Sequence, residues 1–291
     1  MREPDTYRQH SPFTHPGDHK DRLRGLPADL AGMAAIIGGV MVHRDETVWR
    51  FGFELPEERR AEADTRYVEA ILERIGPLAA RPPRERFAGT CRDFTVLLCA
   101  MLREAGVPAR CRAGFAGYFT GNVAGASAEP FYDDHWVVEV CVDGSQADSP
   151  RGWRLVDAQV ASAPKGTYTS AIDPFDVPRD QFIVGGRAWL DCRAGRRDPD
   201  RFGVSVANAT GMWEIQGNVV RDLAALNRLE VLPWDGWDLI PIHYDKLGEP
   251  ERELLDRAAE AGAAGGPLER VAEVYESDAR LQVPAELSRQ S

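Results

Sequence analysis

The sequence has no hydrophobic run long enough to cross a bilayer. Its longest apolar stretch, residues 30–42, is interrupted by glycines and falls short of the ~20 residues that a membrane-spanning helix needs. The first five residues, MREPD, are polar, and no apolar segment of the kind that directs secretion follows them. These absences predict a cytoplasmic protein without a membrane partner.

Positive charge is scarce in this chain. It has 35 Lys and Arg residues against 46 Asp and Glu residues, which gives a net charge of −11. An acidic chain lacks the general attraction to phosphate backbones on which nucleic-acid binding depends. Nucleic acid is therefore not an expected partner.

Residue patterns typical of metal centres and disulfide frameworks are also missing. The number of cysteines is odd, and no two of them form a CxxC pair. His10, His15 and His19 have no partner carboxylate at helical spacing, and the sequence contains no EF-hand loop. We therefore expect no metal or other cofactor. The five cysteines are Cys91, Cys99, Cys111, Cys141 and Cys192.

The chain does have enough apolar content for a full core, since 43% of its 291 residues are hydrophobic. Residues 57–75 begin with acidic side chains and continue with apolar ones at helical spacing, which predicts a helix. The clearest helix spans residues 91–105, because its apolar side chains recur at intervals of three and four. Residues 218–230 predict a further helix, whereas residues 29–42 fit a helix or a strand equally well.

Three segments that follow the clearest helix have the valines, aromatic residues and partial alternation of strands: residues 109–119, 135–142 and 153–158. Because a helix comes first and strands follow without a repeated strand-helix-strand pattern, we predict an α+β fold. Alternation in the second strand places His135 and Trp136 on opposite faces of the sheet.

Cys91 opens the clearest helix, and this position favours reactivity. A cysteine is nucleophilic as the thiolate, and the dipole and unpaired N–H groups of a helix N-terminus lower the pKa of a thiol. The backbone N–H of Cys91 is also available as a donor to an oxyanion. His135 heads the second expected strand and Asp157 lies near the end of the third. If these strands pair, the carboxylate reaches the imidazole and can hold its tautomer.

Each of these residues alone has a simpler interpretation. A helical cysteine is most often a small buried hydrophobic residue, and a single histidine is most often structural. An aspartate at the end of a strand commonly caps a turn. The chemical interpretation depends on the three residues being brought together.

Four short motifs occur in an order that resembles the core of the transglutaminase-like superfamily. They are GTCRDF at residues 89–94, LREAGVPAR at 102–110, DHWVVEV at 134–140 and WRLVD at 153–157. The resemblance covers residues 87–159, and residues 218–237 also look like a family of bacterial transglutaminase-domain proteins. It implies a papain-like α+β core, a helix packed against an antiparallel sheet, in which Cys91 is the nucleophile, His135 the general base and acid, and Asp157 the orienting carboxylate.

The resemblance also implies an aromatic or polar group beside the thiol that assists the oxyanion, for which Trp49 and Trp136 are the candidates. The superfamily commonly has a small residue directly after the histidine, where this chain has Trp136, so we expect a difference in strand register and in the acyl pocket. The expected organisation is a flexible N-terminal arm at residues 1–25, a catalytic domain at residues 26–245 and an appended helical segment at residues 246–291.

Together these features predict cysteine-dependent acyl transfer. Cys91 would attack a peptide, amide, ester or thioester donor, and water or an amine would resolve the thioester acyl-enzyme. Water makes the protein an amidase or peptidase, whereas an amine makes it a transglutaminase-type amide synthase, for example in a biosynthetic pathway. The alternatives are a thiol hydrolase of small esters and a non-catalytic scaffold that keeps the fold to bind peptides or proteins. The sequence leaves open the oligomeric state and the identity of donor and acceptor.

Overall fold

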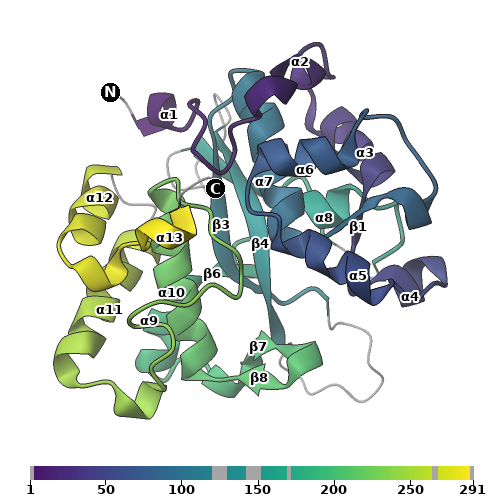
Figure 1. Cartoon of the computed structure of the whole chain (residues 1–291). Coiled ribbons are helices and arrows are strands. Elements are labelled where there is room, and N and C mark those ends of the chain that lie inside the picture. Colours follow the sequence, from purple (N-terminus) through teal and green to yellow (C-terminus); the bar gives the residue numbers. More distant parts are fainter. Residues whose placement is uncertain (1–2, 120–129, 142–151, 169–171, 264–267, 289–291) are drawn as a thin grey trace.

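The computed structural model describes residues 3–119, 130–141, 152–168, 172–263 and 268–288 (Figure 1). The helices are α1 (Glu3–Thr6), α2 (Lys20–Leu23), α3 (Leu30–Val40), α4 (Thr47–Phe51), α5 (Glu57–Arg60), α6 (Val68–Ile75), α7 (Cys91–Glu104), α8 (Ala158–Ala161), α9 (Gly185–Arg193), α10 (Met212–Leu226), α11 (Glu249–Ala263), α12 (Leu268–Glu276) and α13 (Ala285–Ser288). The strands are β1 (Met41–His43), β2 (Phe87–Gly89), β3 (Ala109–Ala116), β4 (Tyr132–Cys141), β5 (Trp153–Val156), β6 (Phe182–Val184), β7 (Phe202–Val204) and β8 (Ala209–Thr210).

A largely antiparallel sheet runs through the middle of the molecule, and helices cover both of its faces (Figure 1). Its strand order is β6-β3-β4-β7-β8, and β5 pairs with β4 as well. Strands β3 and β4 are antiparallel with Ala113 opposite Trp136, whereas β4 and β7 are parallel. A separate parallel pair, β1 and β2, places His43 opposite Gly89, two residues before Cys91. The predicted α+β fold with a papain-like core is confirmed.

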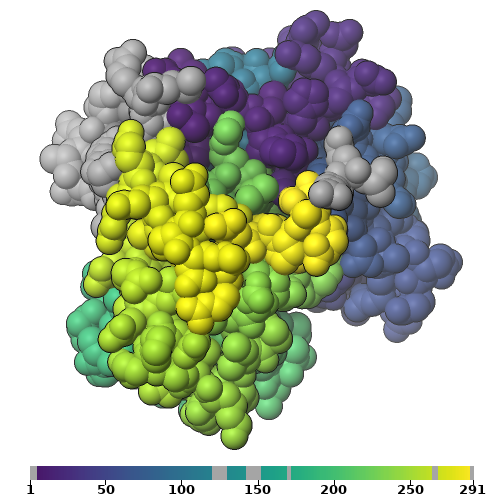
Figure 2. All heavy atoms as spheres, turned by 60° about the vertical axis from the view of Figure 1, so that its left-hand side comes forward, coloured from purple at the N-terminus to yellow at the C-terminus, as the bar shows by residue number. Residues whose placement is uncertain are grey.

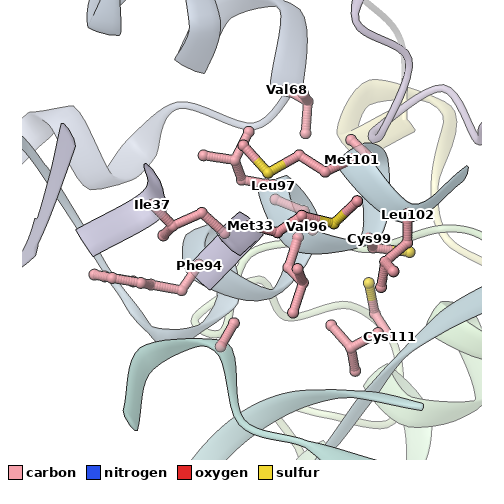
Figure 3. Close-up of a cluster of buried hydrophobic side chains, with 14 of the residues drawn as sticks. Met33, Ile37, Val68, Phe94, Val96, Leu97, Cys99, Met101, Leu102 and Cys111 are labelled. Carbon is pink, nitrogen blue, oxygen red and sulfur yellow. The ribbon is translucent and has the colours of Figure 1, made fainter. Parts of the chain in front are cut away.

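Helix α7 covers one face of the sheet. Phe94 and Leu97 of α7 pack against Ile37 of α3 and lie in one apolar cluster with Cys111 of β3 and Trp136 of β4 (Figure 3). The spacing of apolar residues that predicted this helix is therefore the spacing of its contacts with the core. The helix begins at Cys91 as expected and ends at Glu104.

Helix α10 covers the opposite face and is tied to the sheet by buried charges. Arg112 of β3 donates to Asp222 of α10 at 2.9 and 2.7 Å, and to Glu139 of β4 at 2.9 Å. Arg110 also donates to Glu139, at 2.6 Å. Burial acts to raise the pKa of Glu139, but the positive charges of its arginine partners outweigh burial and hold that pKa well below its ordinary value. This charge network fixes β3, β4 and α10 relative to one another.

The N-terminal residues differ from the flexible arm that their composition predicted. Tyr7 and Phe13 are completely buried. The Tyr7 hydroxyl donates to the carbonyl of Leu226 at 2.7 Å, and the Ser11 hydroxyl donates to Glu230 at 2.7 Å. The few aromatic side chains of this segment bury enough apolar surface to hold it against the core. The polar residues that outnumber them in the sequence led to the wrong prediction. In Figure 2 the N-terminal and C-terminal segments occupy the same face of the molecule.

The expected C-terminal helices are present in the described residues as α11, α12 and α13. Leu254 of α11 and Val271 of α12 belong to the same apolar cluster as Trp189 of α9 and Leu223 of α10. The backbone carbonyl of Gly262 in α11 also accepts a hydrogen bond from Arg112 at 2.8 Å. These helices therefore share a core with the elements that cover the sheet.

Other element boundaries depart from the sequence-based expectation. The helix expected over residues 57–75 is divided into α5, a 3₁₀ turn (Ala61–Asp64) and α6, because the backbone is extended at Thr65 and Tyr67. The ambiguous residues 29–42 form α3 followed by β1. Helix α10 begins at Met212 rather than at residue 218. Within the described residues, no helix is both long enough and apolar enough to span a membrane.

Candidate active site

The N-terminus of α7 meets the edge of β4 between two strand pairings. Strand β5 pairs with the C-terminal half of β4, and β7 pairs with Tyr132 and Asp133 at its beginning. Between these pairings, the backbone N–H of Trp136 hydrogen-bonds to Cys91, and its carbonyl accepts a bond of 3.0 Å from the Thr95 hydroxyl. Cys91 and Thr95 are one helical turn apart, so both face the strand. The strand edge therefore fixes the position of the thiol.

The turn that precedes Cys91 is held by Asp93. Its carboxylate accepts hydrogen bonds from the backbone N–H of Thr90 at 2.8 Å and from the Thr90 hydroxyl at 3.2 Å. Arg92 donates to the same carboxylate at 3.1 Å, and both charged side chains are completely buried. A Cβ atom at Gly89 would lie 2.9 Å from the Cβ of Asp93, closer than real contacts allow. The residues around the cysteine thus build the helix start.

His135 and Asp157 are in contact across the paired strands β4 and β5. His135 Nε2 lies 2.9 Å from Asp157 Oδ2, and the Tyr118 hydroxyl donates to the same oxygen at 2.6 Å. The other oxygen, Oδ1, accepts the backbone N–H of Val160 at 2.9 Å and so caps α8. Asp157 therefore both caps a helix and contacts the histidine. The expected pairing of the two strands is confirmed.

His135 and Asp157 each stabilise the charged form of the other. Burial acts to lower the pKa of His135, but the charge and hydrogen bond of Asp157, with a smaller effect of Cys91, outweigh burial and raise that pKa to about 10. Burial acts to raise the pKa of Asp157, but the charge of His135 and the hydrogen bonds of His135 and Tyr118 hold it below its ordinary value. At neutral pH the pair is therefore an imidazolium and a carboxylate.

The Cys91 thiol contacts the other side of the imidazole. Because Nε2 faces Asp157, the nitrogen left for Cys91 is Nδ1. Burial raises the pKa of Cys91, and the hydrogen bond and charge of His135 act in the opposite direction, as does the backbone N–H of Trp136. Only 8% of the Cys91 surface is exposed. The reactivity of this thiol therefore depends on His135.

Cys91 and His135 line a cavity of about 640 Å³. This volume lies in the range of sites that hold small ligands. The ring of Phe119 packs edge-on against His135, with 4.9 Å between the ring centroids. Tyr118 and Phe119 also line the cavity. A substrate would enter a partly aromatic space beside the thiol.

One wall of the cavity is a polar cluster around Glu46. The Glu46 carboxylate accepts hydrogen bonds from Arg50 at 2.8 Å, from Gln159 at 2.9 Å and from Tyr168 at 2.8 Å. Trp49 packs edge-on against Tyr168, and 55% of its surface is exposed. The amide oxygen of Gln159 is buried and has no hydrogen-bond partner within the described residues. This wall therefore combines the exposed indole of Trp49 with the buried amide oxygen of Gln159.

A second part of the lining carries acidic side chains. Asp133 accepts the backbone N–H of Ser205 at 2.9 Å, and Asp134 accepts a hydrogen bond from Asn218 at 2.5 Å. Burial raises the pKa of Glu214, and the charge of Asp134 adds to the effect. The charges of this part of the lining favour a cationic or neutral ligand over an anionic one.

The two candidate tryptophans lie in different places. Trp49 lines the cavity with Cys91 and His135. The indole of Trp136 is completely buried in the apolar cluster beneath α7, because alternation turns it to the face of β4 opposite to that of His135. Its candidate role as an oxyanion group is therefore wrong for the side chain, and its backbone N–H is what reaches Cys91.

Sequence patterns did not indicate Tyr118 or Phe119 as site residues. Both follow the end of β3 and have no periodicity of their own. Tyr118 meets Asp157, 39 residues away, only through the folded sheet. Among the described residues, no group of three or more His, Cys, Asp and Glu side chains is placed to hold a metal ion.

Comparison with known proteins finds a family that matches this part of the chain. A family model described as the transglutaminase-like superfamily matches residues 76–158, which contain Cys91, His135 and Asp157. A solved structure of a candidate cysteine protease from Cytophaga hutchinsonii is similar, with 15% sequence identity, a TM-score of 0.33 and coverage of 62% of this chain and 44% of that chain. The transglutaminase of red sea bream is also similar, with 16% identity, a TM-score of 0.29 and coverage of 47% and 25%.

The chain spans less than half of the length of either solved protein. No curated protein matches it. The family match does, however, contain the helix that starts at Cys91 and the paired strands that carry His135 to Asp157. Residues 76–158 of this chain therefore match the transglutaminase-like superfamily.

Proposed function

We propose that the protein catalyses cysteine-dependent acyl transfer through a thioester acyl-enzyme. Cys91 is the nucleophile, His135 the general acid and base, and Asp157 the residue that orients His135. The observation that carries the proposal is the placement of His135 between Cys91 and Asp157 at the wall of a cavity of about 640 Å³. The family match over residues 76–158, which include all three residues, supports the same assignment.

In the first half-reaction, Cys91 Sγ bonds to the carbonyl carbon of an amide, ester or thioester. Cys91 attacks as the thiolate partner of the His135 imidazolium, which holds the proton on Nδ1 because Nε2 remains bonded to Asp157. The tetrahedral intermediate then collapses, the bond to the leaving group breaks, and His135 returns the proton to the departing nitrogen, oxygen or sulfur. The product of this step is a thioester on Cys91.

In the second half-reaction, water or an amine attacks the thioester carbonyl. His135 takes a proton from the attacking atom, and the carbon–sulfur bond breaks to restore the Cys91 thiolate beside the His135 imidazolium. The negative oxygen of each intermediate lies near the N-terminus of α7, where the backbone N–H of Cys91 is a candidate donor. Trp49 is the candidate side chain for the same role, since it lines the cavity beside the thiol.

Cavity charge favours a class of substrate. Five of the side chains that line the cavity carry carboxyl groups, whereas Arg44 contributes a positively charged guanidinium. The guanidinium of Arg44 packs over the ring of Trp234 at 4.6 Å. A neutral acyl donor with a neutral or cationic acceptor therefore fits this cavity better than an anionic substrate does. Both water and amines remain candidate acceptors, and the donor is a peptide, an amide or a (thio)ester.

The pH dependence of iodoacetamide labelling at Cys91, mapped by mass spectrometry, tests the proposal. In His135→Ala the effect of burial on the pKa of Cys91 is largely unopposed, so this pKa should rise. Labelling should therefore shift to higher pH and slow by about tenfold or more at pH 7.5. Asp157→Asn should slow it less, because Cys91 keeps the imidazole. In the same samples Cys192, whose pKa burial raises to about 12, reports the reactivity of a partly buried thiol without a histidine partner.

A screen of acyl donors with and without amines then separates hydrolysis from aminolysis. Cys91→Ser should abolish both activities. If labelling of Cys91 is no faster than that of Cys192 and does not respond to His135→Ala, the catalytic proposal is wrong. That result would favour the alternative of a scaffold that keeps the fold to bind peptides or proteins.

A further inference from the structure

A second cavity, of about 440 Å³, is lined by residues of α9, of the turn after it, and of β4 and β7. It shares no lining residue with the cavity beside Cys91. Its charge is opposite to that of the chain, because four arginines and two aspartates line it in a protein of net charge −11. These residues are Arg187, Arg196, Arg197, Arg201, Asp191 and Asp198. The lining therefore has a surplus of two positive charges (4 − 2).

The carboxylate of Asp191 lies close to three of these arginines. This carboxylate, 5% exposed, lies 2.8 Å from Arg187 Nε, 2.7 Å from Arg196 Nη2 and 3.6 Å from Arg197 Nε. Burial acts to raise the pKa of Asp191, but the hydrogen bonds of Arg187 and Arg196 outweigh burial and lower it. Each guanidinium carries five N–H donors, so a single carboxylate cannot occupy them all. Asp191 thus positions the arginines and leaves N–H groups for a ligand.

The floor of this cavity is rigid. Arg197 donates to the Tyr132 hydroxyl at 3.0 Å and lies over the Tyr132 ring at 5.2 Å. The ring of Tyr132 stacks on Phe202, with 4.9 Å between centroids and an angle of 11° between planes. Both aromatic residues are buried, by 93% or more of their surfaces. Binding would therefore cost little side-chain ordering at this floor.

We propose that this cavity binds the phosphate monoester of a small organic molecule. A phosphate monoester carries a charge of about −1.5 to −2 at pH 7, which matches the surplus of the lining. Arginine forks bind the oxygens of phosphate in pairs. The cavity volume of about 440 Å³ falls in the range of sites that enclose whole small ligands, so it has room for an organic group attached to the phosphate.

The site does not depend on the proposed acyl transfer. Tyr132 of β4 lines the basic cavity, whereas Asp133, Asp134 and His135 of the same strand line the cavity of Cys91. A ligand in the basic cavity would therefore lie beside the strand that carries His135, without contact with the thiol.

Isothermal titration calorimetry of the full chain with phenyl phosphate tests the proposal. Inorganic phosphate and benzoate serve as the comparison ligands. We expect saturable binding of phenyl phosphate that is tighter than that of either comparison ligand, since inorganic phosphate lacks the organic group and benzoate carries one charge. Affinity should fall as salt is raised. Arg187→Gln with Arg196→Gln should weaken binding by about tenfold or more.

A charge-matched control is Arg193→Gln with Arg270→Gln. Arg193 lies on the same helix but pairs with Asp256, and Arg270 pairs with Glu273 on α12. The control should bind phenyl phosphate as the wild type does. Arg196→Gln alone, with a side chain 56% exposed, gives the same comparison if the double variant does not fold. Equal binding by pocket variant and control, no binding of phenyl phosphate, or equal binding of all three ligands would overturn the proposal.

Discussion

Replacing Asp157 with Asn should lower the pKa of His135 from about 10 to below 6.5. Burial acts to lower this pKa, and the carboxylate of Asp157 is the largest influence that opposes burial. Asparagine keeps the size of the side chain and an oxygen that can accept the backbone N–H of Val160, but it removes the negative charge. With the charge gone, burial dominates and favours the neutral imidazole.

The size of the effect follows from the two pKa values. The difference between about 10 in the folded protein and 6.5 for an ordinary histidine is about 3.5, which corresponds to about 5 kcal/mol at ~1.4 kcal/mol for each tenfold change. This is the net effect of Asp157 and Cys91 against burial, so a fall to below 6.5 in Asp157→Asn corresponds to more than about 5 kcal/mol. Since folding raises this pKa, the stabilisation is fully present below pH 6.5 and is lost as pH rises through about 10. The variant should lose less stability over this range than the wild type.

Nuclear magnetic resonance of the imidazole carbons during a pH titration measures the pKa of His135 directly. The matched control is Tyr118→Phe, which removes a hydrogen bond to the same Asp157 oxygen but keeps the charge. In this control the pKa of His135 should stay near 10 or rise, because the carboxylate loses a competing donor. A pKa above 8 for His135 in Asp157→Asn would refute the assignment of Asp157 as its main electrostatic partner.

Three further substitutions test the surroundings of the site. Glu139→Gln should lower the free energy of unfolding, measured with urea, by roughly 3–5 kcal/mol, because two buried arginines lose their shared charge; a loss below about 1 kcal/mol would contradict this account of the network. Gly114→Ala should cost about 1–3 kcal/mol in the same assay, since the new Cβ would lie 2.4 Å from the carbonyl oxygen of Ile183 on β6. Asp93→Ala removes the carboxylate that holds the turn before Cys91, so it should lower the melting temperature and slow iodoacetamide labelling of Cys91. Unchanged labelling would show that this turn does not position the thiol.

Local patterns in the sequence were sufficient to predict the central features of the site. The start of α7 at Cys91 follows from a polar turn before an amphipathic run, and the structure shows the turn held by Asp93. The strands that carry His135 and Asp157 follow from β-branched and aromatic residues between polar turns, and they pair as expected. The start of a helix and the extent of a strand depend on residues close together in the chain, so both can be predicted from the sequence.

The walls of the cavity could not be predicted in the same way. Glu46 contacts Gln159 and Tyr168, which are 113 and 122 residues away, and no periodicity links these positions. The N-terminal arm was mispredicted for a related reason. Burial of Tyr7 and Phe13 depends on a groove formed by distant elements, whereas composition reports only the average polarity of the segment.

Asp157 shows why structural and chemical interpretations of a residue need not compete. One carboxylate oxygen caps α8 through the N–H of Val160, and the other receives His135 and Tyr118. The cap fixes the side-chain rotamer, and the rotamer aims the second oxygen at the imidazole. Substitution by alanine would therefore remove the cap, the hydrogen bonds and the charge together, whereas asparagine keeps an acceptor for the cap and removes the charge. Only the asparagine variant separates orientation from electrostatics at this site.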